Sequence, residues 1–197
     1  MLNNTLLNNT LLNDQLWWYI ARAGGIVALV LAAASVIWGL LLASGMLERT
    51  PPRRWLLEVH RWLGGLTVSF TALHMLALWL DSFIEYSVIE LVVPLASNQA
   101  PGRWPIAWGI VAFYCLAAVQ ISSIFMKRLP RRWWRAVHML SFGVLAAGIT
   151  HGASAGTDSS SSLYLLGVIG LGLITVFLTT YRVLTRRPKP NRRVVAV

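Results

Sequence analysis

Five long apolar stretches occupy most of this sequence of 197 residues. Each is at least about 20 residues long, which is the length that a helix needs to cross the hydrocarbon core of a bilayer. Only 12% of the residues are charged, against about one quarter in a soluble domain. We therefore predict an all-α integral membrane bundle of five transmembrane helices, at Trp17–Leu47, Trp55–Leu80, Trp104–Met126, Trp133–Ala153 and Leu163–Val183.

The segments that connect the spans differ in charge. Of the 17 Lys and Arg residues, 15 lie in Glu48–Arg54, in Lys127–Arg135, in the tail from Arg182 and at Arg61. Five spans place all of these on one side of the membrane. Because basic loops stay in the cytoplasm, we predict an outer N-terminus and an inner C-terminus. The net charge of +10 thus indicates topology. We expect no nucleic-acid partner, which would need a basic polar surface.

Three segments are predicted to lie outside the hydrocarbon core. Residues 1–16 form a polar outer tail without the basic cluster or cleavage site of a signal peptide. Between the second and third spans, Ile84–Leu95 is predicted as a short amphipathic helix on the outer surface. Residues 185–197 form a basic cytoplasmic tail that contacts inner-leaflet lipid. Residues 17–184 between the two tails form the transmembrane domain.

The single cysteine limits the metal chemistry. Cys115 lies within an apolar stretch, so the sequence excludes an intramolecular disulfide, a thiolate zinc site and a cysteine-ligated iron–sulfur cluster. It also contains no glycine-rich nucleotide-binding motif. Nitrogen must therefore carry most of the ligation of any metal that this chain holds.

All four histidines lie in two spans. His60 and His74 are 14 residues apart in the second span, and His138 and His151 are 13 residues apart in the fourth. At about 1.5 Å per residue, the two members of each span stand roughly 20 Å apart. Both spans run from the cytoplasm outwards, so His60 pairs in depth with His138, and His74 pairs with His151. A lone intramembrane histidine can be a hydrogen-bonded core residue, but paired ionisable residues at two depths indicate a functional site.

Two neutral imidazoles at one depth are suitable axial ligands for heme iron, whereas zinc would need three or four ligands there. We therefore expect two stacked bis-histidine sites. In an ideal helix, however, two side chains 13 residues apart point in directions that differ by about 140° around the helix axis, so they would not share a face. Gly143, Gly148 and Gly152 allow local overwinding or an early end of the helix in the fourth span, and a rotation of the heme planes is the alternative way to accommodate the offset.

Four other polar side chains in or near the spans each have two possible roles. Arg61 and Arg135 lie nearest the inner pair and are candidates for contacts with heme propionates, although positive-inside topology also explains them. Arg22 lies just inside the outer end of the first span, where it either contacts a propionate or reaches for the interface. Gln120, in the middle of the third span, is either a helix–helix contact or a quinone ligand.

The histidines belong to two local motifs. The first is His60-Arg61-Trp62-Leu63-Gly64 followed by His74, and the second is Leu129-Pro130-Arg131-Arg132-Trp133-Trp134 followed by His138 and His151. With these motifs on alternate spans, the chain between Trp17 and Tyr181 resembles the ferric reductase-like transmembrane domain family. That family includes ferric-chelate reductases, the membrane half of NADPH oxidases and the heme-bearing membrane subunit of the bacterial periplasmic methionine sulfoxide reductase system.

The resemblance implies that the four histidines are axial ligands of two b-type hemes. His60 and His138 would hold the inner heme, and His74 and His151 the outer heme, with electrons passing from the inner to the outer one. Larger family members have six spans and a cytoplasmic domain for flavin and NADPH. This sequence has five spans and no such domain, so we expect a separate electron donor: a protein, a quinol or free reduced flavin.

The acceptor is expected on the outer side, as ferric iron, a flavin-bearing protein or a periplasmic reductase. Under this hypothesis the chain is an oxidoreductase-type electron-transfer subunit of a bacterial cytoplasmic membrane, with no catalytic residue of its own. The alternative hypothesis is a cation transporter or channel subunit, in which the intramembrane histidines are transient metal ligands.

Overall fold

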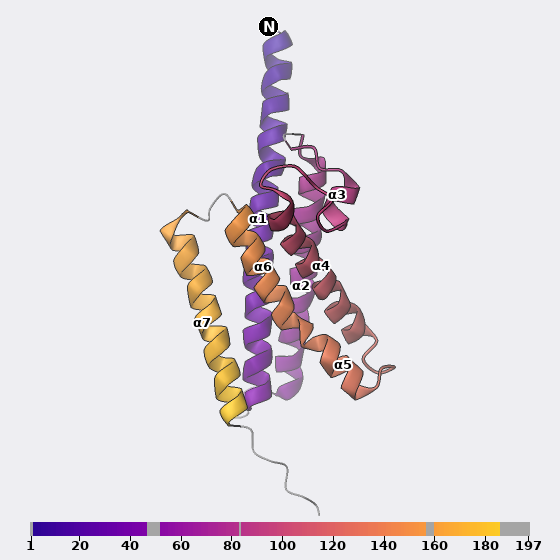
Figure 1. The fold of residues 1–197 in the computed structure, drawn as a ribbon, viewed down its shortest axis with the longest axis vertical. Helices are drawn as coiled ribbons and strands as arrows, with labels where there is room; N and C mark the ends of the chain where they lie inside the picture. The colour runs from indigo at the N-terminus through magenta and orange to yellow at the C-terminus, as the bar shows by residue number, and fades with distance from the viewer. Residues whose placement is uncertain (1, 47–51, 83, 157–159, 186–197) are drawn as a thin grey trace, which may run out of the picture.

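A computed structural model describes residues 2–46, 52–82, 84–156 and 160–185, with the backbone alone for residues 2–14. Over these residues the chain is helical (Figure 1), with helices α1 (Leu2–Ser44), α2 (Arg53–Leu80), α3 (Val88–Val92), α4 (Arg103–Ile124), α5 (Arg131–His138), α6 (Leu140–Ala155) and α7 (Ser162–Leu184). Five segments are long and apolar enough to cross a membrane: Gln15–Ser44, Arg53–Leu80, Arg103–Ile124, Arg131–Ala155 and Ser162–Leu184. The predicted all-α fold with five apolar spans is confirmed.

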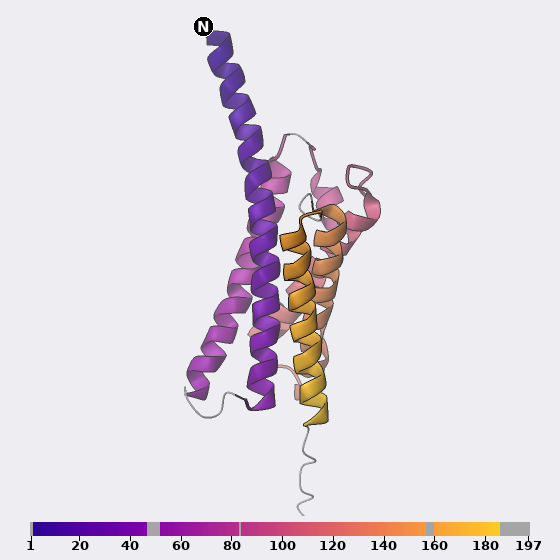
Figure 2. The ribbon, with the colours of Figure 1, turned by 90° about the vertical axis from the view of Figure 1, so that its left-hand side faces the viewer.

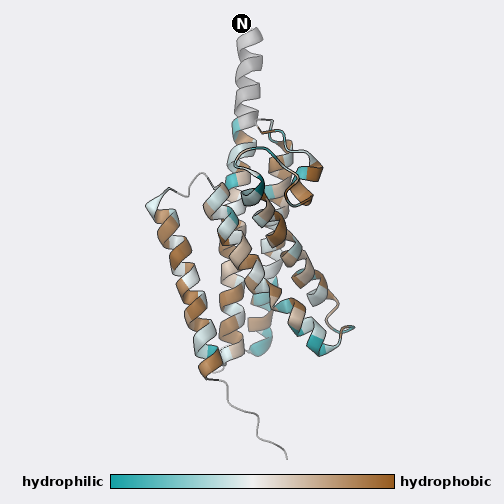
Figure 3. Cartoon of the chain, in the orientation of Figure 1, coloured by the Kyte–Doolittle hydropathy of each residue, from teal (hydrophilic) through white to brown (hydrophobic). Residues whose placement is uncertain are grey.

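Helix α1 lies at the centre of the bundle. It packs along α2 on one side and against α6 and α7 on the other, while α4 packs against α6 (Figures 1 and 2). Its buried positions include Ala21, Ala28, Ala32 and Ala33, and such small side chains allow neighbouring helices to approach closely within a membrane. The hydrophobic residues lie along the middle of the helices, and hydrophilic residues gather at the two ends of the bundle (Figure 3).

The helix α1 extends further than its apolar span. It begins at Leu2, whereas the sequence predicts the span from Trp17, and its first turns project beyond the other helices (Figure 2). The repeated Leu-Asn-Asn-Thr segment contains no Gly or Pro. A helix that is already nucleated by packing can therefore continue through this segment.

The fourth span is interrupted immediately after its first histidine. Helix α5 ends at His138, and α6 begins at Leu140. At the junction, the Phe142 N–H donates to the Met139 carbonyl at 3.2 Å, a tight turn that rotates about 120° per residue instead of 100°. The glycines that the sequence offers for a distortion, Gly143, Gly148 and Gly152, all lie within the continuous helix α6, and the interruption falls before them at Met139. Met139 adopts ordinary right-handed backbone angles, so the turn needs no glycine.

The segment between α2 and α4 folds over one end of the bundle. Its helix α3 is shorter than the predicted Ile84–Leu95, because Pro94 follows the last turn and cannot continue a helix. A capping box starts α3, in which Ser87 and Glu90 satisfy each other's backbone N–H groups. Leu91 is buried in a cluster with Ile106 and Ile110 of α4, which fixes this segment above the cavity described below.

Candidate functional site

The four histidines form two pairs in the structure. The ring centroids of His60 and His138 are 6.0 Å apart, and those of His74 and His151 are 6.2 Å apart. Helix α2 supplies the first member of each pair, while α5 and α6 supply His138 and His151. The interruption at Met139 therefore separates the two histidines of the fourth span, and each of them faces a partner on α2.

In the second pair, main-chain carbonyls fix both imidazoles. His74 Nδ1 lies 2.6 Å from the Ala21 carbonyl oxygen, and His151 Nδ1 lies 2.8 Å from the Pro105 carbonyl oxygen. Because a carbonyl oxygen only accepts hydrogen bonds, both Nδ1 atoms carry the proton and donate. Each Nε2 atom therefore keeps a lone pair, and this is the arrangement of a metal-ligating histidine with an anchored second nitrogen.

The first pair is held differently. His60 Nδ1 has a longer contact of 3.4 Å with the Ser35 hydroxyl oxygen. The His138 ring stacks on the Trp134 indole at a centroid distance of 5.0 Å and an interplanar angle of 26°. His138 Nδ1 is buried and has no hydrogen-bond partner among the residues that the structure describes.

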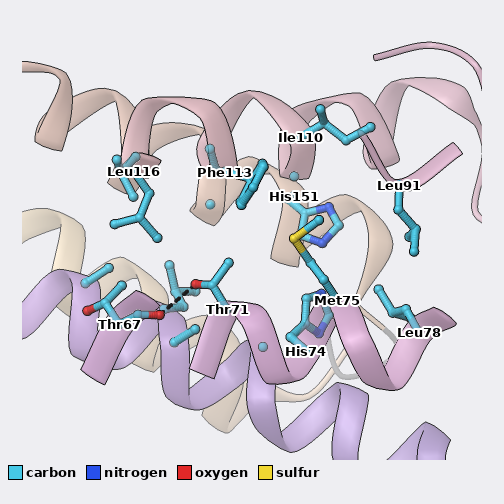
Figure 4. A pocket seen from close by; sticks show the side chains of 18 of the residues that line it. Thr67, Thr71, His74, Met75, Leu78, Leu91, Ile110, Phe113, Leu116 and His151 are labelled. Atoms are coloured by element: carbon cyan, nitrogen blue, oxygen red, sulfur yellow. Dashed lines mark hydrogen bonds between the residues drawn. The ribbon is translucent and has the colours of Figure 1, made fainter. Parts of the chain in front are cut away.

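A cavity surrounds the second pair. It has a volume of about 130 Å³, opens to the surface, and is lined by residues of α1, α2, α3, α4 and α6. Figure 4 shows His74 and His151 directed into the same part of this cavity. Apart from the two histidines, its walls are apolar or contain threonines that bond to their own helix, and they include Ala28, Thr67, Thr71, Leu91, Ile110, Phe113, Leu116 and Val144.

The donor set of each pair fits an iron porphyrin. A metal ion bound to two Nε2 atoms at about 2 Å each places the ring centroids roughly 6 Å apart, as both pairs show. Each depth offers only two nitrogen ligands, and no group of three or more His, Cys, Asp or Glu residues lies together in the described part of the chain. Two imidazoles would suffice for the iron of a porphyrin, whose own nitrogens would supply its remaining ligands, whereas zinc would need one or two further protein ligands at the same depth.

The three arginines considered for propionate contacts lie at different places. Arg22 lies over the Trp18 ring, with its guanidinium carbon 4.2 Å from the ring centroid, a cation–π geometry at the same end of the bundle as His74. Arg61 is exposed beside Glu58 and Trp62, and Arg135 is exposed on α5. Their contact with propionates stays a prediction.

Gln120 packs over a glycine of the neighbouring helix. A Cβ atom at Gly64 would lie 2.6 Å from Gln120 Nε2, so the amide fills the space that the missing side chain leaves between α2 and α4. This contact favours the helix–helix interpretation of Gln120 over that of a quinone ligand.

The sequence did not point to the residues that hold the rings in place. Ala21 and Pro105 act through their main-chain carbonyls, and every residue has a carbonyl, so no residue type marks them. Their role depends on how α1 and α4 are rotated against α2 and α6, which only the packed bundle shows.

The fold and the site together define a class of integral membrane protein: a helical bundle that carries paired histidines at two depths. The chain belongs to the ferric reductase-like transmembrane component family, whose model matches residues 24–149. The matched segment contains His60, His74 and His138 and ends two residues before His151.

A curated relative supports this assignment. The chain is 30% identical over 122 residues to the heme-binding subunit MsrQ of protein-methionine-sulfoxide reductase from Herminiimonas arsenicoxydans. The similarity covers 58% of this chain and 53% of that protein, so the chain spans about half the length of its relative. No solved structure shows a significant match.

Proposed function

We propose that this chain is a diheme membrane subunit that carries electrons across a bilayer. His60 and His138 hold one b heme, and His74 and His151 hold a second heme nearer the outer side. The observation that carries this proposal is the presence of two histidine pairs, both with ring centroids about 6 Å apart. The relative named as a heme-binding subunit supports the identity of the cofactor. Bound heme supplies reversible one-electron chemistry.

The protein orients the ligands and keeps water away from them. At the outer pair, the carbonyls of Ala21 and Pro105 fix the rotation of the two imidazoles, so that both Nε2 atoms are ready to bind iron without rearrangement. Apolar side chains such as Leu91, Ile110 and Phe113 line the same cavity. A dry, apolar surrounding lowers the polarity around the cofactor and influences its reduction potential.

The two sites span much of the apolar thickness. Fourteen residues of continuous helix α2 separate His60 from His74, or about 20 Å along the helix axis. Because the hydrocarbon core is about 30 Å thick, one site lies towards each surface. Two redox centres at these depths provide a path for electrons through a layer that charged carriers cross poorly.

We propose an outer N-terminus and an inner C-terminus, in a bacterial cytoplasmic membrane. The support is the uneven charge of the bundle: basic residues crowd the end that holds the start of α2, all of α5 and the end of α7, whereas Arg22 and Arg103 lie at the opposite end. Basic segments remain cytoplasmic. On this orientation, His60 and His138 form the inner site.

The orientation can be measured by cysteine labelling. Replacing the single Cys115 with Ser gives a cysteine-free chain, into which one cysteine is placed at Ser82 or at Arg128. In intact spheroplasts, a membrane-impermeant maleimide should label the cysteine at 82 and not the one at 128. The reverse pattern would overturn the orientation.

The electron donor and acceptor are separate molecules in this proposal. The donor is a cytoplasmic protein, a quinol or reduced flavin. The relative is named as a subunit of a methionine-sulfoxide reductase, which favours a periplasmic reductase as acceptor over a flavin-bearing protein or ferric iron. Substrate chemistry then belongs to that partner, and this chain supplies electrons to it.

Heme content tests the proposal. The full chain is expressed with heme supply, purified in detergent and analysed by its reduced-minus-oxidised spectrum and by the pyridine hemochrome assay. We expect low-spin b-type bands and two hemes per chain. A colourless preparation would overturn the electron-transfer function, and a colourless preparation that binds zinc or another divalent cation would favour the cation transporter or channel.

A further inference from the structure

Three of the four histidine rings lie over glycines of a neighbouring helix. The glycines are Gly25 and Gly39 on α1 and Gly109 on α4, and they face His74, His60 and His151, respectively. In each case the glycine comes four residues after the group that contacts the histidine Nδ1: Ala21, Ser35 and Pro105.

The spacing of four residues explains why glycine is needed there. A residue four positions later lies one turn along the same helix face, and its side chain would cover the acceptor. A Cβ atom would lie 2.9 Å from His151 Nδ1 at Gly109, 3.1 Å from His74 Nδ1 at Gly25, and 3.3 Å from His60 Cε1 at Gly39. Each glycine thus forms a notch that lets the imidazole reach the backbone or hydroxyl oxygen below it.

His138 departs from this arrangement. Its ring has no such glycine contact and no Nδ1 acceptor in the part of the chain that the structure describes. Instead it stacks on Trp134, one turn earlier on the same helix. Stacking restrains the plane of the ring but supplies no acceptor for its N–H group.

We infer that the glycine notches at Gly25 and Gly109 make the outer pair a rigid site, in which main-chain carbonyls anchor both imidazoles. Trp134 positions His138 in the inner site, where the imidazole rings are held less rigidly. This inference rests on the proposed function, because it describes how the chain tunes two bound hemes. Gly25, Gly109 and Trp134 are positioning residues, since they act on the heme through the histidines.

The two histidine pairs should give their hemes different reduction potentials. An imidazole that donates its Nδ1–H to a carbonyl is a more basic ligand and stabilises oxidised iron. Both outer ligands donate in this way at 2.6 and 2.8 Å, whereas the contact of His60 with Ser35 is 3.4 Å long. The outer heme should therefore have the lower midpoint potential, so the step from the inner to the outer heme is uphill and depends on the donor and the acceptor to drive it.

The first experiment uses alanine substitutions at the notches in the heme-loaded full chain. The signals of the outer heme are identified as those that His74→Ala removes. Gly109→Ala should raise the outer midpoint potential and shift the outer low-spin signal in electron paramagnetic resonance, while the inner heme keeps its values. Gly25→Ala should have the same effect to a smaller extent, because its contact is longer. The control is Gly170→Ala on α7, where a Cβ would meet nothing within 4 Å.

The second experiment tests the stacking of the Trp134 ring on His138. Trp134→Leu should broaden or shift the inner heme signal and leave the outer one unchanged, and Trp134→Phe should restore most of the original signal. Trp133→Leu is the matched control, because the side chain of Trp133 is 59% exposed. Equal spectra for Trp134→Leu and the unmodified chain would overturn the role of Trp134.

The outcomes separate this inference from the proposed function. An outer midpoint potential equal to or above the inner one overturns the inference, as does a Gly109→Ala protein whose two hemes both match the unmodified chain. If Gly109→Ala does not fold, Gly25→Ala decides in the same way. A chain that binds no heme at all overturns the proposed function itself. Two hemes that are insensitive to the notches leave that function intact and remove only the inference.

Discussion

His151 Nδ1 lies 2.8 Å from the Pro105 carbonyl oxygen, a bond that joins α6 to α4 across 46 residues of sequence. The matching bond from His74 to Ala21 joins α2 to α1. The outer pair is therefore held by all four of these helices, and each imidazole has only one nitrogen left for a ligand. This relationship determines how single histidine substitutions should behave.

Substituting either member of a pair should remove one heme and spare the other. His74→Ala or His151→Ala should remove the outer heme, because the two rings lie 6.2 Å apart and would share one cofactor under the proposed function. His60→Ala or His138→Ala should remove the inner heme in the same way. The measurement is the hemochrome ratio of each purified variant to the unmodified chain, with one heme per chain expected.

The assignment of signals provides the control for this prediction. The two variants of one pair should leave identical residual spectra, and the variants of the other pair should leave the complementary spectrum. If His74→Ala and His60→Ala lost the same heme, the pairing seen in the structure would not describe the heme sites.

Ser35 should influence only the inner heme, and only weakly. Its hydroxyl oxygen is 3.4 Å from His60 Nδ1, at the long limit of a hydrogen bond, so little ligand basicity depends on it. Ser35→Ala should keep two hemes per chain and raise the inner midpoint potential slightly. Redox titration followed optically measures the effect. Loss of the inner heme in this variant would show that the hydroxyl is an essential anchor.

The stability of the segment over the outer cavity should depend on pH through Glu90. Hydrogen bonds from the Ser87 backbone, the Ser87 hydroxyl and Ser97 hold the pKa of Glu90 below its ordinary value of 4.5. Since the carboxylate is favoured in the folded state, this contribution is fully present above pH 4.5. It is lost as the pH falls through the lowered pKa.

Hydrogen exchange of the backbone amides at 87–93 can measure this pH dependence. Protection should fall in the unmodified chain between neutral pH and the acid range below 4.5. Glu90→Gln should show reduced protection already at neutral pH, because it lacks the charged acceptor of the capping box. A Glu90→Gln chain with the same protection as the unmodified chain at neutral pH would contradict this role. The α4 amides serve as the internal reference.

Much of the fold follows from the sequence, because burial in lipid leaves few solutions for a chain with five apolar stretches. The pairing of His60 with His138 could be predicted, because residue spacing along two parallel spans determines the depth of each histidine in the membrane. The break at Met139, the acceptor role of Pro105 and the notch at Gly109 could not be predicted in this way. They depend on how neighbouring helices are rotated and where they touch. Apolar helix faces can pack in many rotations of similar energy, so the sequence alone does not identify the one that is adopted.

The contact of Gln120 with Gly64 should contribute to the packing of α2 against α4. A Cβ at position 64 would lie 2.6 Å from Gln120 Nε2, so Gly64→Ala overpacks the contact, which costs about 1–3 kcal/mol of unfolding free energy in a well-packed site. Gln120→Ala removes the obstructing amide. In the double variant the added methyl group occupies the space that the amide leaves, so most of the loss from Gly64→Ala should be recovered.

A double-mutant cycle on the heme-loaded chain in detergent measures this coupling through the thermal unfolding midpoint. The combined change should differ from the sum of the single changes, since the two side chains share one space. If the changes in unfolding midpoint were additive, the Gln120 amide would move away from position 64 when a methyl group is added there. The amide would then not fill the gap between the two helices. Gly170→Ala, which faces open space on α7, is the control for the intrinsic effect of Gly→Ala in a helix, where alanine is favoured by up to about 1 kcal/mol. Subtracting that effect isolates the steric cost at Gly64.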